Sequence, residues 1–308
     1  MKILVTCPPM LGMMDELEYL FDGKDVQVSC PQVLQTMSEE ELVKLVPLHD
    51  GWIIGDDPAT RRVFAAGKAG NLKAAVKWGI GVDNVDFSAA KEFEIPITNT
   101  PDMFGREVAD VAMSYVVALA RETFFIDREV RKGNWPKPRG ISLSGKTVGL
   151  VGFGDIGRSV ARRLLAAEMK VIAYDPFFKP VSGISVEQAA WPARVEECDF
   201  LLFTCSLNEK NRHMLNADVL ARAKDGVYVV NVARGPLIDE QALIRALETG
   251  KVRSAALDVF EQEPLSTVSP LHRFERCIFG SHNGSNTSDA VRRTSERAVN
   301  LLFGFLGI

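Results

Sequence analysis

The chain has few of the features that mark a secreted or membrane protein. Its 308 residues include five cysteines, an odd number, and no two of them form a Cys-x-x-Cys pair. Neither a disulfide framework nor a zinc site is therefore indicated, and a reducing cytoplasm is expected. The longest apolar run, Val111 to Ala120, is about half the roughly 20 residues needed to span a bilayer. We therefore expect no membrane partner and no bound metal.

An excess of positive charge is also missing. The formal net charge is -4 at pH 7, whereas nucleic acids and anionic membranes are bound through concentrated basic surfaces. Neighbouring cations such as Arg292 and Arg293 fit a solvated helix face. The charge therefore argues against nucleic acid as a partner.

The residues that are present indicate a globular protein with two domains. Hydrophobic residues make up 46% of the chain and charged residues 25%, which is ordinary for a folded protein. A chain of this length exceeds the size at which one hydrophobic core stops growing. The apolar start, Met1 to Val5, is interrupted by Cys7, Pro8 and Pro9, so it predicts a first β-strand and not a signal peptide.

Short β-branched runs alternate with helical patterns, which is typical of a parallel α/β fold. In the first third, one helix is marked by Ser38 followed by Glu41, a capping box, and the final segment, 287–305, is also helical in pattern. A polar stretch, 132–145, looks like a domain connection. Strands are predicted at 2–6, 26–28, 51–54, 74–77 and 96–98, and in a second series at 147–151, 170–174, 199–204, 227–231 and 254–259; helices are predicted at 105–121 and 240–248.

A glycine-rich turn lies between a predicted strand and a predicted helix. Gly152 would permit the tight turn, Gly154 would let the backbone approach a pyrophosphate, and Gly157 would allow close packing of helix on strand. The phosphates would meet the N–H groups of Asp155 and Ile156 at the helix N-terminus. This pattern, in this context, predicts a dinucleotide site.

Asp175 ends the next predicted strand, near the spacing expected for the acid that binds the ribose hydroxyls. A carboxylate at that position repels the 2′-phosphate of NADP. The sequence therefore favours NAD as the cofactor.

Three later segments each place one charged or titratable residue beyond a predicted strand, where ligands bind to parallel sheets. They are Arg234 in Asn-Val-Ala-Arg-Gly-Pro, Glu263 in Glu-Gln-Glu-Pro, and His282 in Gly-Ser-His-Asn-Gly. With the glycine motif, these segments resemble the D-isomer-specific 2-hydroxyacid dehydrogenases over essentially the whole chain, with a similarity to the phosphoglycerate dehydrogenase branch.

The resemblance implies a role for each residue. Arg234 would hold the substrate carboxylate, His282 would donate or accept the proton, and Glu263 would orient the imidazole and favour its charged form. Asp258 maps to the nicotinamide end of the cofactor, and the backbone of Val232 and Ala233 maps to cofactor contacts.

The resemblance also places a substrate loop in the first domain. There the N–H groups of Gly79, Ile80 and Gly81 could form a nest for a carboxylate. Lys77 and Arg106 are candidate phosphate ligands. Gly55 is followed by two acids, whereas many phosphoglycerate enzymes carry an arginine at this strand end. This difference argues against a phosphorylated substrate.

The overall prediction is an α/β protein of two doubly wound parallel-sheet domains, flavodoxin-like and Rossmann, with a cleft between them. Residues 1–100 plus 287–308 would bind substrate and residues 101–286 would bind NAD. The expected enzyme is a cytoplasmic homodimer, dimerising through the cofactor domain and the helix after Arg106. A phosphoglycerate-dehydrogenase-like activity is preferred. The alternatives are a glyoxylate or hydroxypyruvate reductase and a dinucleotide-sensing module that binds proteins.

Overall fold

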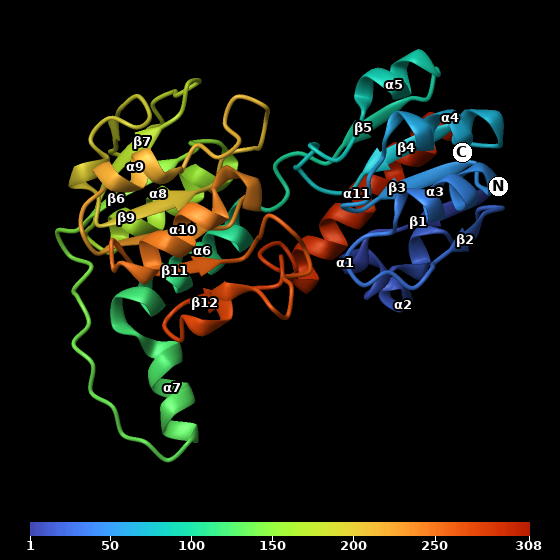
Figure 1. Cartoon of the computed structure of the whole chain (residues 1–308). Helices are drawn as coiled ribbons and strands as arrows, with labels where there is room; N and C mark the ends of the chain where they lie inside the picture. The colour runs from blue at the N-terminus through green and yellow to red at the C-terminus, as the bar shows by residue number, and fades with distance from the viewer. The chain divides into compact units, whose positions relative to one another are not determined.

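The computed structural model describes all residues, 1–308, and its chain divides into two compact units. Unit 1 consists of residues 1–103 and 286–308, and unit 2 consists of residues 104–285. Each unit contains one fully parallel sheet with helices on both faces (Figure 1). The prediction of two doubly wound α/β sheets is therefore confirmed. None of the helices has the length and apolar character to cross a bilayer.

Unit 1 has a five-stranded sheet in the order β2-β1-β3-β4-β5, which is the flavodoxin-like order. Both faces are covered, so β1, β3 and β4 bury almost every residue. The strands are β1 (Lys2–Val5), β2 (Gln27–Ser29), β3 (Gly51–Ile54), β4 (Ala74–Lys77) and β5 (Ile97–Asn99).

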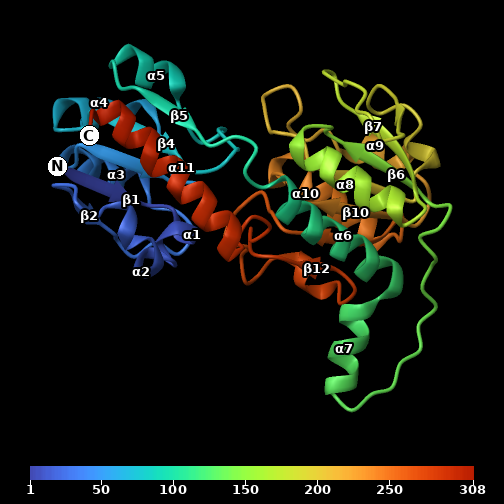
Figure 2. The same cartoon turned by 180° about the vertical axis from the view of Figure 1, so that it is seen from behind.

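Helices α3 (Glu39–Leu45), α4 (Arg61–Ala69) and α5 (Phe87–Glu92) cover one face of this sheet and share a core with it. The predicted capping box at Ser38 begins α3 and is confirmed. The other face is covered by α11 (Ser288–Leu306), which lies on β3 and β4 and contacts α1 (Pro8–Leu11) (Figure 2). The last helix of the chain thus completes the core of the first unit. The short α2 (Met14–Leu17) follows α1.

Unit 2 has a seven-stranded sheet in the order β12-β11-β10-β9-β6-β7-β8. This is the Rossmann order with one strand added, and the direction of winding reverses between β6 and β9. The strands are β6 (Thr147–Val151), β7 (Lys170–Tyr174), β8 (Glu187–Gln188), β9 (Phe200–Phe203), β10 (Val227–Asn231), β11 (Val252–Leu257) and β12 (Ile278–Phe279).

The helices of unit 2 form a layer on each side of the sheet. Helices α6 (Gly105–Arg121) and α8 (Asp155–Ala166) pack on each other on one face. Helices α9 (Ala217–Arg222) and α10 (Glu240–Glu248) share a core with the other face. Short 3-10 helices lie at Glu18–Leu20, Val46–Leu48, Val195–Glu197, Gly235–Leu237 and Pro270–Arg273.

The polar stretch 132–145 is not a domain connection, so that prediction is wrong. Helix α6 ends where Glu122 adopts a left-handed conformation, and α7 (Thr123–Arg131) continues in a new direction, away from the sheet (Figure 1). The stretch then runs back within unit 2, where the N–H of Ile141 donates to the carbonyl of Ala120. The chain instead passes between the units after residue 103 and after residue 285.

Candidate active site

The glycine-rich turn after β6 has the geometry expected of a phosphate-binding loop. Gly152 has a φ of +99°, and a Cβ at Gly157 would lie 2.1 Å from the carbonyl oxygen of Gly152, so both positions require glycine. The space beside Gly154, where a Cβ would project, is empty. Helix α8 begins there without a side-chain cap. The N–H groups of Asp155 and Ile156 therefore lie in the first turn of an uncapped helix, which is suited to an anion.

Asp155 and Asp175 fix the surroundings of this turn. The Asp155 carboxylate lies against Gly105 at the start of α6, where a Cβ would come within 2.2 Å of it. Asp175 follows β7, and its oxygens accept the N–H of Phe153 at 2.6 Å and the N–H of Phe177 at 2.8 Å. Asp175 therefore ties the glycine-rich turn to the end of the neighbouring strand.

His282 and Glu263 are paired in unit 2. The Nδ1 atom of His282 lies 2.7 Å from Oε2 of Glu263, and the two side chains are 22% and 21% exposed. Because an ionised carboxylate only accepts, this distance assigns the Nδ1 proton to the bond with Glu263. The other oxygen of Glu263 accepts the N–H of Phe260 at 2.9 Å. The imidazole orientation is thus fixed through a carboxylate that is itself held by the backbone.

Backbone contacts connect the loops that follow β10, β11 and β12. The N–H of Asp258 donates to the carbonyl of Asn231 at 2.9 Å, and the N–H of His282 donates to the carbonyl of Asp258 at 2.7 Å. A Cβ at Gly235 would lie 1.9 Å from the backbone carbon of Phe260, so only glycine allows this approach. The three predicted catalytic residues therefore come from loops that touch one another.

Asp258 has a structural role that the sequence did not reveal. The residue is 3% exposed, and its carboxylate accepts the N–H groups of Asn283 and Gly284, at 3.2 and 2.9 Å. It thereby holds the loop that carries His282. Burial, and then the nearby Asp258 carboxylate, raise the pKa of the Tyr115 hydroxyl above its usual value.

Asn231, at the end of β10, was not among the predicted residues. Its buried amide accepts the N–H of Ala233 and donates to the carbonyl of Arg234. The Arg234 guanidinium in turn donates to the carbonyl of Ala233 at 2.8 Å, and the N–H of Val232 donates across to the carbonyl of Phe203. A local side-chain turn at asparagine is the signal that could have pointed to this residue.

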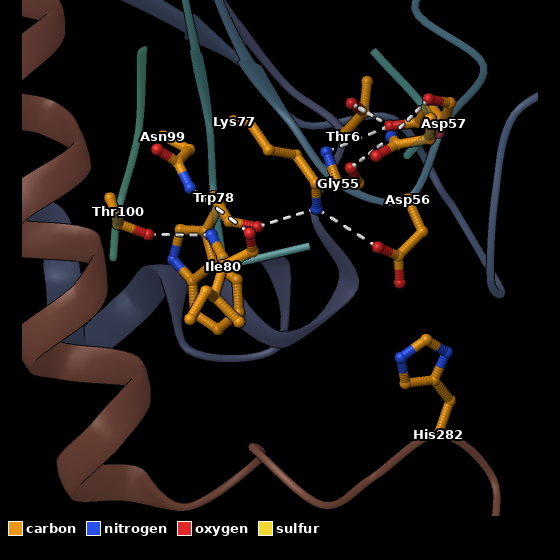
Figure 3. A network of polar contacts seen from close by, with 12 residues as sticks. Thr6, Gly55, Asp56, Asp57, Lys77, Trp78, Ile80, Asn99, Thr100 and His282 are labelled. Carbon is orange, nitrogen blue, oxygen red and sulfur yellow. Dashed lines mark hydrogen bonds and ion pairs between the residues drawn. The ribbon is translucent and has the colours of Figure 1, made fainter. Parts of the chain in front are cut away.

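In unit 1, the turn after β4 differs in one detail from the predicted carboxylate nest. Gly79 has a φ of +119°, but its N–H already donates to the hydroxyl of Thr100 at 2.7 Å (Figure 3). The N–H groups that remain without an acceptor in the chain are those of Ile80 and Gly81. Of the three N–H groups predicted to form a nest, only those of Ile80 and Gly81 therefore remain candidates.

Lys77 is buried beside this turn and is already paired. Its side chain is 3% exposed, and Nζ donates to Oδ1 of Asp56 at 3.1 Å and to the carbonyl of Trp78 at 2.9 Å (Figure 3). At Gly55, a Cβ would come within 2.9 Å of the Cys7 backbone. Arg106, the other predicted phosphate ligand, lies exposed in the first turn of α6, in unit 2.

No group of His, Cys, Asp and Glu side chains is arranged to hold a metal ion. The chemistry that the described residues offer is therefore an imidazole-carboxylate pair for proton transfer, an arginine for an anion, and an uncapped helix N-terminus beside open space.

The comparisons with known proteins agree with this geometry. Residues 113–284 match the family model described as D-isomer specific 2-hydroxyacid dehydrogenase, NAD binding domain. The hydroxypyruvate reductase of Thermotoga maritima is 39% identical over 277 residues, which cover 88% of this chain and 90% of that protein. The TT0316 protein of Thermus thermophilus superposes with a TM-score of 0.86 at 31% identity and covers 100% of this chain and 97% of that one.

A third relative is longer. The D-3-phosphoglycerate dehydrogenase of Archaeoglobus fulgidus is 34% identical over 295 residues, which are 94% of this chain and 54% of that protein. The chain therefore spans about half the length of this relative.

Proposed function

The chain belongs to the D-isomer specific 2-hydroxyacid dehydrogenase family of NAD-dependent oxidoreductases acting on CH–OH donors, and we propose that its substrate is hydroxypyruvate or glyoxylate. One observation carries the choice of substrate: the buried cation Lys77 is already neutralised by Asp56. A short, unphosphorylated 2-keto acid needs no second cation beyond the one that binds its carboxylate.

In this proposal, His282 is the acid and base of the reaction. Its Nδ1 proton is committed to Glu263, so Nε2 is the atom that donates a proton to the oxygen on C2 during reduction and accepts it during oxidation. The Glu263 carboxylate favours the imidazolium, which is the form that can donate. Because Glu263 is held by the N–H of Phe260, the pair keeps its geometry when the proton leaves.

Arg234 is proposed to bind the substrate carboxylate. A guanidinium stays charged at every physiological pH and presents its donors as a flat fork that matches a carboxylate. Its bond to the Ala233 carbonyl fixes one edge of that fork. In unit 1, the N–H groups of Ile80 and Gly81 are the proposed anion-binding donors.

The residues around the glycine-rich turn fit a dinucleotide. The space beside Gly154 and the uncapped start of α8 suit its pyrophosphate, and Asp175 is the proposed acceptor of the ribose hydroxyls. NADH, when bound, supplies the hydride that is added to C2 of the keto acid. The backbone of Val232 and Ala233 and the Asp258 carboxylate are the proposed contacts at its nicotinamide end.

A phosphoglycerate-dehydrogenase-like activity, preferred from the sequence, is the second candidate. It is favoured by the presence of Lys77 and Arg106 and by the similarity to the Archaeoglobus fulgidus D-3-phosphoglycerate dehydrogenase. Against it, Lys77 is paired, and Gly55 leaves no room for a side chain without a shift of the backbone. The hydroxypyruvate reductase of Thermotoga maritima is also more similar, at 39% identity against 34% for the Archaeoglobus fulgidus enzyme.

The test is NADH oxidation with hydroxypyruvate, glyoxylate, pyruvate and 3-phosphohydroxypyruvate, compared by kcat/KM. We expect the highest value for hydroxypyruvate or glyoxylate. A higher value for 3-phosphohydroxypyruvate would select the second candidate, and no turnover of any of the four would refute both.

We also propose a homodimer in a reducing cytoplasm. Several apolar side chains of unit 2 are exposed on and after α7, including Phe124 at 44% and Trp135 at 78%, and a second copy would cover them. All five cysteines are free thiols, as a reducing compartment requires. The molar mass measured by light scattering as the protein elutes from a size-exclusion column tests the dimer, and cell fractionation tests the location.

A further inference from the structure

An acid and a buried lysine lie together at the carboxyl edge of the unit 1 sheet. Asp56 follows β3 and Lys77 ends β4, and these parallel strands pair directly, with Ile54 opposite Lys77. The turn that contains Ile80 and Gly81 comes directly after the end of β4, which Lys77 forms (Figure 3). Any substrate bound at this turn lies at the edge of the sheet where the pair is found.

The Asp56 carboxylate is the negative charge in contact with the Lys77 ammonium group. Removing an ammonium group from water is costly unless a partner compensates for it, and Lys77 is 2% exposed. The neighbouring Asp57 is engaged elsewhere, because it accepts the Thr6 hydroxyl and the N–H groups of Met37 and Gly55. Asp56 is also the better exposed partner of the pair, with 35% of its side chain exposed.

We propose that Asp56 is a specificity-determining residue that excludes 2-keto acids with a phosphate at C3, an inference that rests on the proposed function. A phosphate that binds Lys77 also lies next to the Asp56 carboxylate, because Asp56 is in contact with Lys77. The two negative groups then repel each other. A C3 hydroxyl carries no charge, and it can accept from an ammonium group or donate to a carboxylate. The pair thus offers hydrogen bonds to the distal end of the substrate without offering net charge.

The experiment compares kcat/KM for 3-phosphohydroxypyruvate with kcat/KM for hydroxypyruvate, both with NADH. The variants are Asp56→Asn, which keeps an acceptor for Lys77, and the double variant Asp56→Asn with Lys77→Met. Asp83→Asn is the matched control, because it removes one negative charge from an exposed position in the loop after β4. Asp56→Ser replaces Asp56→Asn if the latter does not fold.

We expect Asp56→Asn to raise the ratio about 10- to 100-fold, mainly through a lower KM for the phosphorylated acid. The double variant should lose this gain, because the released cation is then absent. The proposal is overturned if Asp56→Asn moves the ratio no further than Asp83→Asn does, or if the gain survives Lys77→Met.

A second measurement separates this proposal from the proposed function. Thermal shifts caused by 3-phosphoglycerate and by D-glycerate need no turnover. Wild-type enzyme that prefers the phosphorylated acid refutes both the proposed function and the exclusion by Asp56. Wild-type enzyme that turns over neither acid refutes the proposed function alone. In that case, a larger stabilisation of Asp56→Asn than of wild type by 3-phosphoglycerate, with no such difference for D-glycerate, supports the role of Asp56, and equal stabilisation refutes it.

Discussion

Replacing Glu263 with glutamine tests the proton-transfer assignment most directly. The glutamine oxygen can still accept the Phe260 N–H, which leaves the NH2 group against Nδ1 of His282. An NH2 group can donate to Nδ1 only when that atom carries no proton, so the variant disfavours the imidazolium. Reduction uses the imidazolium as proton donor, and activity should therefore be lost at a lower pH.

The magnitude follows from the bond that is removed. A hydrogen bond to a charged group contributes about 1.5–3 kcal/mol, and one pH unit corresponds to about 1.4 kcal/mol. The pair is only about one-fifth exposed, so solvent screening removes little of this contribution. We expect the midpoint of the falling limb of kcat/KM for keto-acid reduction to move down by about one to two pH units.

The assay is the pH profile of NADH oxidation for wild type and Glu263→Gln, with NADH affinity measured by fluorescence. Below the shifted midpoint the two profiles should converge, and above the wild-type midpoint the variant should be about 10- to 100-fold slower. Glu261→Gln is the control, since this carboxylate lies on the same loop and contacts His213 and the N–H of Glu240 instead. A profile whose midpoint does not move would refute the proposed role of Glu263 in charge stabilisation.

Three further predictions concern separate parts of the molecule. His282→Ala should lower kcat by about 10²- to 10⁴-fold with NADH binding retained; near-normal turnover would reject the assignment. Asp175→Asn should reduce the preference for NADH over NADPH by about tenfold, measured as a ratio of kcat/KM; an unchanged ratio would point to another ribose contact. Bonds from Lys73, and then from the N–H of Lys2, lower the pKa of Asp50, so its stabilisation is present above pH 3.8 and is lost as the pH falls through the folded-state pKa. Asp50→Ala should therefore lower the Tm at pH 7, by an amount that corresponds to about 1 kcal/mol, and the gap should narrow as the pH falls below 3.8; a gap that stays constant there would contradict the linkage.

Local patterns explain why much of the fold was predictable. Most strands of both sheets are short apolar runs between turn signals, and the capping box at Ser38 and the glycine-rich turn at Gly152 specify their own geometry over a few residues. These features need no information from distant parts of the chain. The two-residue edge strands β8 and β12 have too few residues to show a pattern, and they were not predicted at their observed positions.

Pairings between distant residues could not be read from the sequence. The bond between Lys77 and Asp56 depends on the register of β3 and β4, and the occupied N–H of Gly79 depends on where Thr100 lies after β5. The role of Asp258 in holding the loop of His282 likewise follows from the approach of two strand ends. Sequence motifs therefore indicated which residue types are present at the strand ends, but not which of them are already bonded to each other.

The return of α11 to unit 1 has a consequence for the order in which the protein folds during synthesis. A ribosome adds about 5–20 residues per second, so residues 1–103 wait roughly ten seconds or more for the helix that covers β3 and β4. Unit 2 is complete in sequence before unit 1 is. Until Ser288–Leu306 emerges, the residues of β3 and β4 that this helix covers lack their cover, and exposed apolar surface of this kind makes a nascent segment prone to aggregation.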